Sequence, residues 1–325
     1  GDAIRSLIGL GADVNAQDTD GATPMHLAAE AEDGMKSINA LCESGKAKLN
    51  CEDNEGRTPL HRAANSGFVA NIISLCEVTG GHLVLAQKDQ DGNTPLHLAA
   101  INGSLQAVRA MVTKGSNVEE LNNNGLDVFG ACLKSGNRAL SVVQFMLQKE
   151  MGSLKTRYGA AERTPLHIAA EGGSEMIVQE LIKHLGDKRK AISKFLDTED
   201  KDGETAYMIG CKLGHVNVVK CLSAMKCKVH ANVVVDQKTL RTCLHIASCV
   251  PNVDEPNLIR ILVHDGYDLG KPEGSGQSCI HLAAEAGHAD IVETMIQLGV
   301  AADIKDGKGK SAMHISAENG RLRVC

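Results

Sequence analysis

A tetrapeptide of the form Thr-Pro-Leu-His recurs along the whole chain. It is complete at residues 58–61, 94–97 and 164–167, and looser at 23–26, 242–245, 278–281 and 311–314. Two degenerate copies, around Val128 and Ala206, keep neighbouring copies about 33 to 41 residues apart. A period of this length indicates a stack of small structural repeats, each of which contacts only its neighbours.

The residues of one repeat, 89–121, show why each repeat should fold into a pair of helices. A turn-forming run comes first, and Thr94 then offers a helix N-cap with Pro95 at the first helical position. Small and apolar residues predict a short helix that Asn102 and Gly103 end. Apolar residues three and four apart then predict a second helix. Two such short helices cannot bury their apolar faces alone, so each repeat needs a neighbour.

With nine copies in register, the chain resembles the ankyrin-repeat family over essentially all of its 325 residues. The resemblance implies an all-α, right-handed solenoid of helix-turn-helix units with protruding β-hairpin-like turns. It also implies that the motif histidine bonds threonine and backbone groups of its own and neighbouring repeats. The expected repeats are a partial one at 1–17, full ones at 18–52, 53–88, 89–121, 122–158 (degenerate), 159–199, 200–235, 236–269 and 270–304, and a partial one at 305–325. Because both ends lie inside a repeat, we expect a larger parent protein.

Composition narrows the functional classes. The net charge of −6 and the aromatic content of 2% argue against nucleic-acid binding, which needs a basic surface and often stacking rings. No apolar run reaches about 18 residues, so no membrane span is expected within this chain. The 11 cysteines lie mostly at helix positions, where they serve as small apolar residues. We therefore expect a reducing, cytoplasmic location.

Several repeats depart from the pattern. In the fourth, Gly130 stands where the histidine is expected, and this loss predicts a soft seam with faster hydrogen exchange in 124–136 than in 94–102. In the fifth, a basic run at 183–190 predicts a solvated extension of the second helix, or alternatively a docking site for acidic lipid or protein. Pro251 and Pro256 frame a longer link in the seventh repeat.

Several motifs suggest chemistry but lack the necessary context. Three turns, which begin at Asp18, Asp89 and Asp200, resemble the start of a calcium loop without its later ligands. Residues 307–311 resemble the end of a phosphate loop without its first glycine. Cys221, Cys227 and His230 lack the paired half of a zinc site. The motif histidines are too numerous to be catalytic. We expect no enzyme activity, no cofactor and no metal.

The expected working surface is the concave face, formed by the turn tips and the exposed ends of the first helices. The candidate partner-binding residues are Asp20, Glu55, Arg57, Asp91, Asn93, Arg163, Lys201, Lys238, Arg241, Lys308 and Lys310. The N-terminal tips are mixed to acidic and the C-terminal tips lean basic. This pattern fits either ordinary solvation or a polarised groove that orients a peptide or domain. In the second case, reversing the charges of the last four residues weakens partner capture.

Function follows from the resemblance and not from a catalytic site. It implies non-catalytic protein–protein recognition within a larger intracellular protein, by partners that the sequence does not identify. An alternative is the cytoplasmic arm of a transient-receptor-potential type channel, with a membrane-bound parent, and a pathogen effector is a third class. Homo-oligomerisation would use segments outside this chain. Asn15, with Leu7 eight residues upstream, also resembles the exit-turn asparagines of ankyrin repeats that an asparaginyl hydroxylase modifies.

Overall fold

The computed structural model of the chain describes residues 1–78, 84–186, 188–225, 238–250, 255–321 and 323. The chain divides into two compact parts, Gly1–Gly159 and Ala160–Cys325, called here the N-terminal body and the C-terminal body. Every regular element in the described ranges is a helix, which confirms the all-α prediction.

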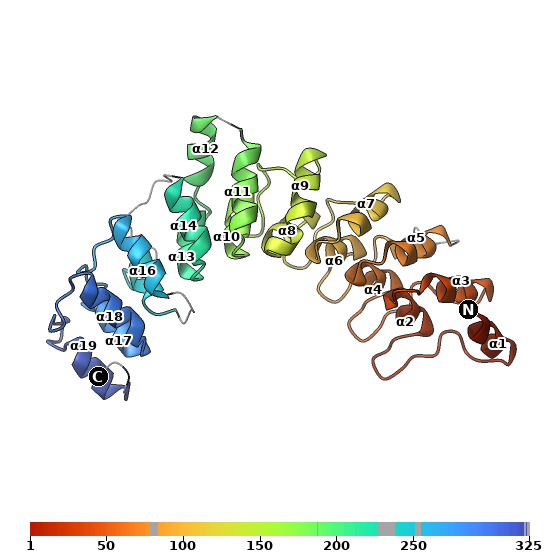
Figure 1. The fold of residues 1–325 in the computed structure, drawn as a ribbon, viewed down its shortest axis with the longest axis horizontal. Coiled ribbons are helices and arrows are strands. Elements are labelled where there is room, and N and C mark those ends of the chain that lie inside the picture. The colour runs from red at the N-terminus through yellow and green to blue at the C-terminus, as the bar shows by residue number, and fades with distance from the viewer. Residues whose placement is uncertain (79–83, 187, 226–237, 251–254, 322, 324–325) are drawn as a thin grey trace. The chain divides into compact units, whose positions relative to one another are not determined.

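Two rows of short helices build the N-terminal body (Figure 1). The inner row is α2 (Pro24–Glu30), α4 (Pro59–Ser66), α6 (Pro95–Ile101) and α8 (Val128–Lys134). The outer row is α1 (Asp2–Gly9), α3 (Met35–Glu43), α5 (Val69–Glu77), α7 (Leu105–Thr113) and α9 (Leu140–Gln148), the last preceded by the 3-10 helix η2 (Asn137–Ala139). Each helix contacts the next one in its row. The core therefore runs between the rows from repeat to repeat.

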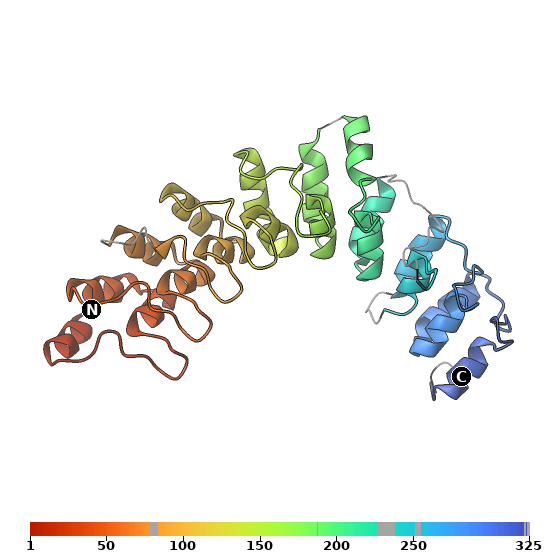
Figure 2. The same cartoon turned by 180° about the vertical axis from the view of Figure 1, so that it is seen from behind.

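The C-terminal body repeats this arrangement (Figure 2). Its inner row is α10 (Pro165–Glu171), α13 (Ala206–Lys212), α15 (Cys243–Ala247), α17 (Cys279–Ala286) and α19 (Ala312–Glu318). Its outer row is α11 (Glu175–His184), α14 (Val216–Ala224), α16 (Glu255–His264) and α18 (Ala289–Gln297). An additional helix, α12 (Arg189–Leu196), follows α11. The prediction that the basic run extends the second helix is wrong, because α11 ends at His184 and Leu196 anchors a separate helix.

The inner helices begin where the tetrapeptide places them. At α6, the His97 N–H donates to the hydroxyl of Thr94 at 3.5 Å, and the Thr94 N–H donates to Nδ1 of His97 at 3.2 Å. This reciprocal cap satisfies backbone groups that a helix start leaves without partners. The same cap occurs at α2, α4, α10, α15, α17 and α19.

Where it is present, the motif histidine also joins its repeat to the next. Because Nδ1 of His97 accepts from Thr94, Nε2 carries the proton and donates to the Leu126 carbonyl in the following turn at 3.3 Å. His61 bonds the Asn93 carbonyl in the same way at 3.0 Å. Burial lowers the pKa of both histidines, so both are neutral near pH 7. These contacts confirm the scaffold role implied by the resemblance.

The fourth repeat closes its seam differently. Asp127 caps α8 by accepting the Gly130 N–H at 2.7 Å, and the Tyr158 hydroxyl donates to the same carboxylate oxygen at 3.1 Å. A Cβ placed on Gly130 would lie 2.8 Å from the Tyr158 ring. The missing histidine thus makes room for a tyrosine from further along the chain. This replacement supplies bonds in place of those of the missing histidine, and faster exchange in 124–136 stays a prediction.

Candidate partner-binding surface

A five-residue turn precedes most inner helices, and an acidic or amide side chain fixes its shape. In the turn before α6, one carboxylate oxygen of Asp89 accepts the N–H groups of Asp91 at 3.0 Å and Asn93 at 2.7 Å. Asp18, Asp53, Asp200 and Asp306 bond their own turns in the same way, as does Asn122. The aspartates considered as calcium ligands are therefore occupied as turn-forming residues.

Side-chain amides connect neighbouring turns in the N-terminal body. Asn54 Nδ2 donates to the Thr19 carbonyl at 3.0 Å, and Gln90 Nε2 donates to the Asn54 carbonyl at 2.9 Å. Asn123 Nδ2 continues the series to the Gln90 carbonyl at 2.8 Å. Backbone bonds between adjacent turns run alongside, such as Asn54 N to Asp20 O at 3.0 Å. We call this series the amide ladder. It fixes the spacing between successive turn tips.

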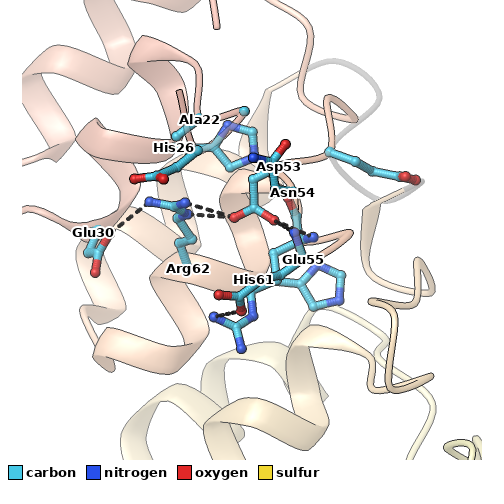
Figure 3. Close-up of polar contacts among 12 residues, drawn as sticks. Ala22, His26, Glu30, Asp53, Asn54, Glu55, His61 and Arg62 are labelled. Carbon is cyan, nitrogen blue, oxygen red and sulfur yellow. Dashed lines mark hydrogen bonds and ion pairs between the residues drawn. The ribbon is translucent and has the colours of Figure 1, made fainter. Parts of the chain in front are cut away.

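An ion cluster joins Glu30 of α2, Asp53 of the turn before α4 and Arg62 of α4 (Figure 3). The Arg62 guanidinium contacts Asp53 at 2.8 Å and Glu30 at 3.2 Å. The Asp53 side chain is 2% exposed, whereas that of Glu30 is 51% exposed. Although burial opposes ionisation, backbone N–H groups and Arg62 outweigh it and lower the pKa of Asp53. The cluster therefore exposes mainly the Glu30 carboxylate, because the Arg62 side chain is only 19% exposed.

The C-terminal body carries a comparable cluster around Arg163. Its guanidinium lies 3.1 Å from Glu171, 3.4 Å from Asp200 and 3.8 Å from Glu204. Lys212 adds a further ion pair to Glu204. Arg163 therefore serves the fold of its own body, and little of its charge is free to attract a partner.

The other predicted cations are also largely compensated. Lys201 pairs with Glu162 at 2.8 Å, Arg241 with Glu273 at 3.4 Å, and Lys310 with Glu318 at 2.6 Å. Lys238 and Lys308 are exposed. These pairs reduce the basic character that the sequence alone attributes to the C-terminal turns.

The predicted residues of the N-terminal body fall into two groups. Asp20, Glu55 and Asp91 lie exposed at turn tips, and Arg57 pairs with Glu55 at 2.5 Å. Asn93 requires a correction, since it is only 7% exposed and its side-chain oxygen accepts from Asn122 at 2.9 Å. Its position beside the motif threonine turns it inward, so it offers a partner almost no surface.

Sequence analysis did not single out Leu27 and Arg62. Each lies four residues after the motif threonine of its repeat, and the residue at this position in α6 is the buried Leu98. Leu27 is 53% exposed and lies one helical turn from Glu30, next to the ion cluster. A charged residue at 62 in an otherwise apolar position was the signal that could have revealed this site.

Asn15 is half-buried and both ends of its amide are bonded. Its nitrogen donates to the Lys46 carbonyl at 2.9 Å, and its oxygen accepts from the Lys48 N–H at 2.9 Å. The side chain therefore connects two consecutive exit turns. Its hydroxylation stays a prediction.

The remaining motifs fall within the scaffold or outside the described part. Residues 307–310 form the turn closed by Asp306, and Cys221 is buried in α14. Cys227, His230 and Pro251 lie outside the described residues. No described group of three or more histidine, cysteine or acidic side chains is placed to hold a metal ion. None of the helices in the described ranges is long and apolar enough to cross a bilayer.

Comparison with known proteins adds a family and a set of distant relatives. The family model for ankyrin repeats in three copies matches residues 1–82, 82–157, 129–233 and 244–325. The crystal structure of the human ASB11 ankyrin repeat domain is similar with a TM-score of 0.57 and 21% identity, over 75% of this chain and 99% of that one. This likeness concerns the fold alone.

Curated relatives share short stretches with the chain. The transient receptor potential cation channel subfamily A member 1 of Drosophila melanogaster is 24% identical over 192 residues, which are 56% of this chain and 15% of the relative. The probable E3 ubiquitin-protein ligase XBOS33 of Oryza sativa subsp. japonica is 25% identical over 218 residues, 55% of this chain and 40% of the relative. The leucine-rich repeat serine/threonine-protein kinase 1 of Caenorhabditis elegans is 23% identical over 129 residues, 39% of this chain and 5% of the relative. The matches thus span between 5% and 40% of each relative's length.

Proposed function

The chain belongs to the ankyrin-repeat family, whose fold is a protein-interaction scaffold, and we propose that it holds a protein partner on its inner face. This face comprises the turn tips and the exposed ends of the inner helices. The observation that carries the proposal is the exposed Leu27 beside the Arg62–Glu30 pair, on a surface whose turn spacing the amide ladder fixes. An apolar anchor rimmed by charged groups is typical of an interaction site.

Rigid turns favour this use of the surface. Binding costs less when the groups that contact a partner are already ordered, because their conformational entropy is lost before binding. The turns of the N-terminal body are fixed by their own aspartates and by the ladder.

Photo-crosslinking from matched positions tests the proposal. A photoreactive amino acid replaces Leu27 on the inner face or Met176 on the outer helix α11, both of them exposed apolar residues at 53% and 48%. In the full parent protein, we expect a specific adduct from position 27 and none from 176. Purified partner should then bind the Leu27→Asp variant at least about tenfold more weakly, and the Met176→Asp variant normally. Equal effects of the two substitutions would refute the inner face as the site.

A second candidate concerns the parent protein. The similarity to a transient receptor potential channel supports the alternative that this array is the cytoplasmic arm of an ion channel. Membrane fractionation of the parent distinguishes the classes. Release only by detergent supports the channel arm, and recovery in the soluble fraction supports an adaptor.

A further inference from the structure

A groove runs between the outer helices α14 and α16 of the C-terminal body, on the side opposite the inner row. Its volume is about 540 Å³ and it is open to solvent. Its lining residues are Val216, Asn217, Lys220, Ser223, Ala224, Asn257, Arg260, Ile261 and His264. None of these nine is acidic. The groove therefore combines an apolar floor with a basic rim.

The two permanent cations of the rim are uncompensated. Lys220 and Arg260 are exposed, and neither has a carboxylate within ion-pair distance among the described residues. Arg260 donates instead to the neutral Gln297 side chain at 3.2 Å, and His264 is exposed at the end of the same helix face. This differs from the inner face, where Arg163, Arg241 and Lys310 all meet acids.

The nearby carboxylate is occupied beneath the groove. Asp265 accepts hydrogen bonds from the Tyr207 and Ser223 hydroxyls, both at 2.6 Å, and its side chain is only 7% exposed. The bond from Ser223 joins α14 to the residue that follows α16 and fixes the groove floor. One Asp265 oxygen also lies 3.5 Å from Nδ1 of His264, so this carboxylate acts on the rim at His264 and not at Lys220 or Arg260.

A groove between outer helices is common to the stack, so shape alone indicates nothing. In the N-terminal body, α3 and α5 form a groove of about 530 Å³. Its lining residues are Met35, Asn39, Ala70, Ile73, Ser74, Glu77 and Val78. Its charged member is Glu77, which pairs with Lys114 at 3.0 Å. The two grooves share a place in the fold and differ in charge, which singles out the one in the C-terminal body.

We propose that the α14–α16 groove is a second docking site, which takes an acidic amphipathic helix of a partner protein. Two side-by-side helices with an apolar floor at Val216 and Ile261 accept the apolar stripe of a third helix. Acidic residues on its flanks then meet Lys220 on one side and Arg260 on the other. The chain as a whole carries a net charge of −6, so attraction of an acidic segment has to arise locally.

The test uses the full chain and a fluorescent 20-residue helical peptide with leucines on one face and glutamates on its flanks. We expect saturable binding by anisotropy that weakens with salt. Lys220→Glu combined with Arg260→Glu should weaken binding at least about tenfold. The control, Lys46→Glu with Lys149→Glu, makes the same change in net charge at exposed sites of the other body and should alter binding less than about twofold.

A third variant separates seating in the groove from general attraction. Ala224→Arg adds a positive charge and fills the groove, so we expect it to weaken binding although it makes the chain less acidic. Tighter binding by this variant would overturn the site, as would equal losses in the two charge-reversed pairs or absence of saturable binding. Circular dichroism identifies any variant that fails to fold. The Leu27→Asp variant should bind this peptide normally, so the test stands apart from the inner-face proposal.

Discussion

Two neighbouring seams of the N-terminal body, each the contact between an inner helix and the turn that follows it, are closed by different side chains. One reaches forward along the chain and the other reaches back. In the seam after α6, His97 belongs to the inner helix, caps it through Thr94 and reaches forward to the Leu126 carbonyl. In the seam after α8, Gly130 leaves the space open, and Tyr158 reaches back to the capping carboxylate of Asp127. A repeat array therefore does not require its consensus residue at every copy. It requires that the cap be bonded and the space filled.

Restoring the consensus at the fourth repeat should be the most damaging change. Gly130→His places a side chain where the Tyr158 ring already lies, since even a Cβ would approach that ring to 2.8 Å. Overpacking of this kind should lower the free energy of unfolding by about 3 kcal/mol. Urea unfolding measures the loss. Adding Tyr158→Ala should recover part of this loss. If Gly130→His is as stable as the unsubstituted chain, the two side chains do not compete for the same space.

Removing the consensus histidine should cost somewhat less. His97→Ala leaves the Thr94 N–H and the Leu126 carbonyl without their partners in a buried seam and opens a small cavity. We expect a loss of about 2 kcal/mol in the same unfolding measurement. His314→Ala is the matched control, because its imidazole is exposed at the last inner helix. Equal losses at the two positions would contradict a bridging role for His97.

A smaller effect is expected when only the tyrosine hydroxyl is removed. Tyr158→Phe keeps the ring that fills the space and loses one hydrogen bond of 3.1 Å to Asp127. The expected decrease is about 1 kcal/mol. Together with Tyr158→Ala, this variant divides the seam into packing and hydrogen bonding. A larger loss of unfolding free energy from Tyr158→Phe than from Tyr158→Ala would show that the ring does not contribute by packing.

The two seams should respond to acid with opposite signs. Burial lowers the pKa of His97 below its usual 6.5, so the unfolded chain binds the proton more readily and stability falls as pH drops through about 6.5. Burial raises the pKa of Asp127 above its usual 3.8, so acidification between the usual and the raised value favours the folded state. Opening free energies from hydrogen exchange at pH 7 and pH 5 should fall in 94–102 and not in 127–133. A parallel fall would contradict this assignment.

The sequence was sufficient for the repeat architecture because its signals are local. A threonine, a proline and a histidine in four consecutive residues determine where an inner helix begins, and the recurring spacing supplies its neighbours. Tyr158 was not predicted because it lies 31 residues from Asp127, and nothing local links them. Helix α12 was missed because its lysines and arginine obscured the apolar pair Ile192 and Leu196.

The candidate surface was only partly predictable for a similar reason. Turn tips such as Asp20 and Asp91 are exposed in every folded repeat, so their position within the repeat was enough to predict their exposure. Ion pairing depends on side chains that adjacent repeats bring together, as with Arg241 and Glu273, which lie 32 residues apart. Leu27 was not singled out, and it is 53% exposed although its counterpart Leu98 is buried. Exposure at such a position depends on the neighbouring repeat and not on the residue itself.

An N-terminal body that forms one continuous scaffold presents its inner face at a fixed spacing. Native-state hydrogen exchange at neutral pH tests this most directly, by comparing amides of 94–102 with those of 124–136. If Tyr158 seals the fourth seam, the buried amides of α6 and α8 should show opening free energies within about 1 kcal/mol of each other. Markedly faster exchange confined to 124–136 would show that the seam is soft and that the scaffold is interrupted at α8.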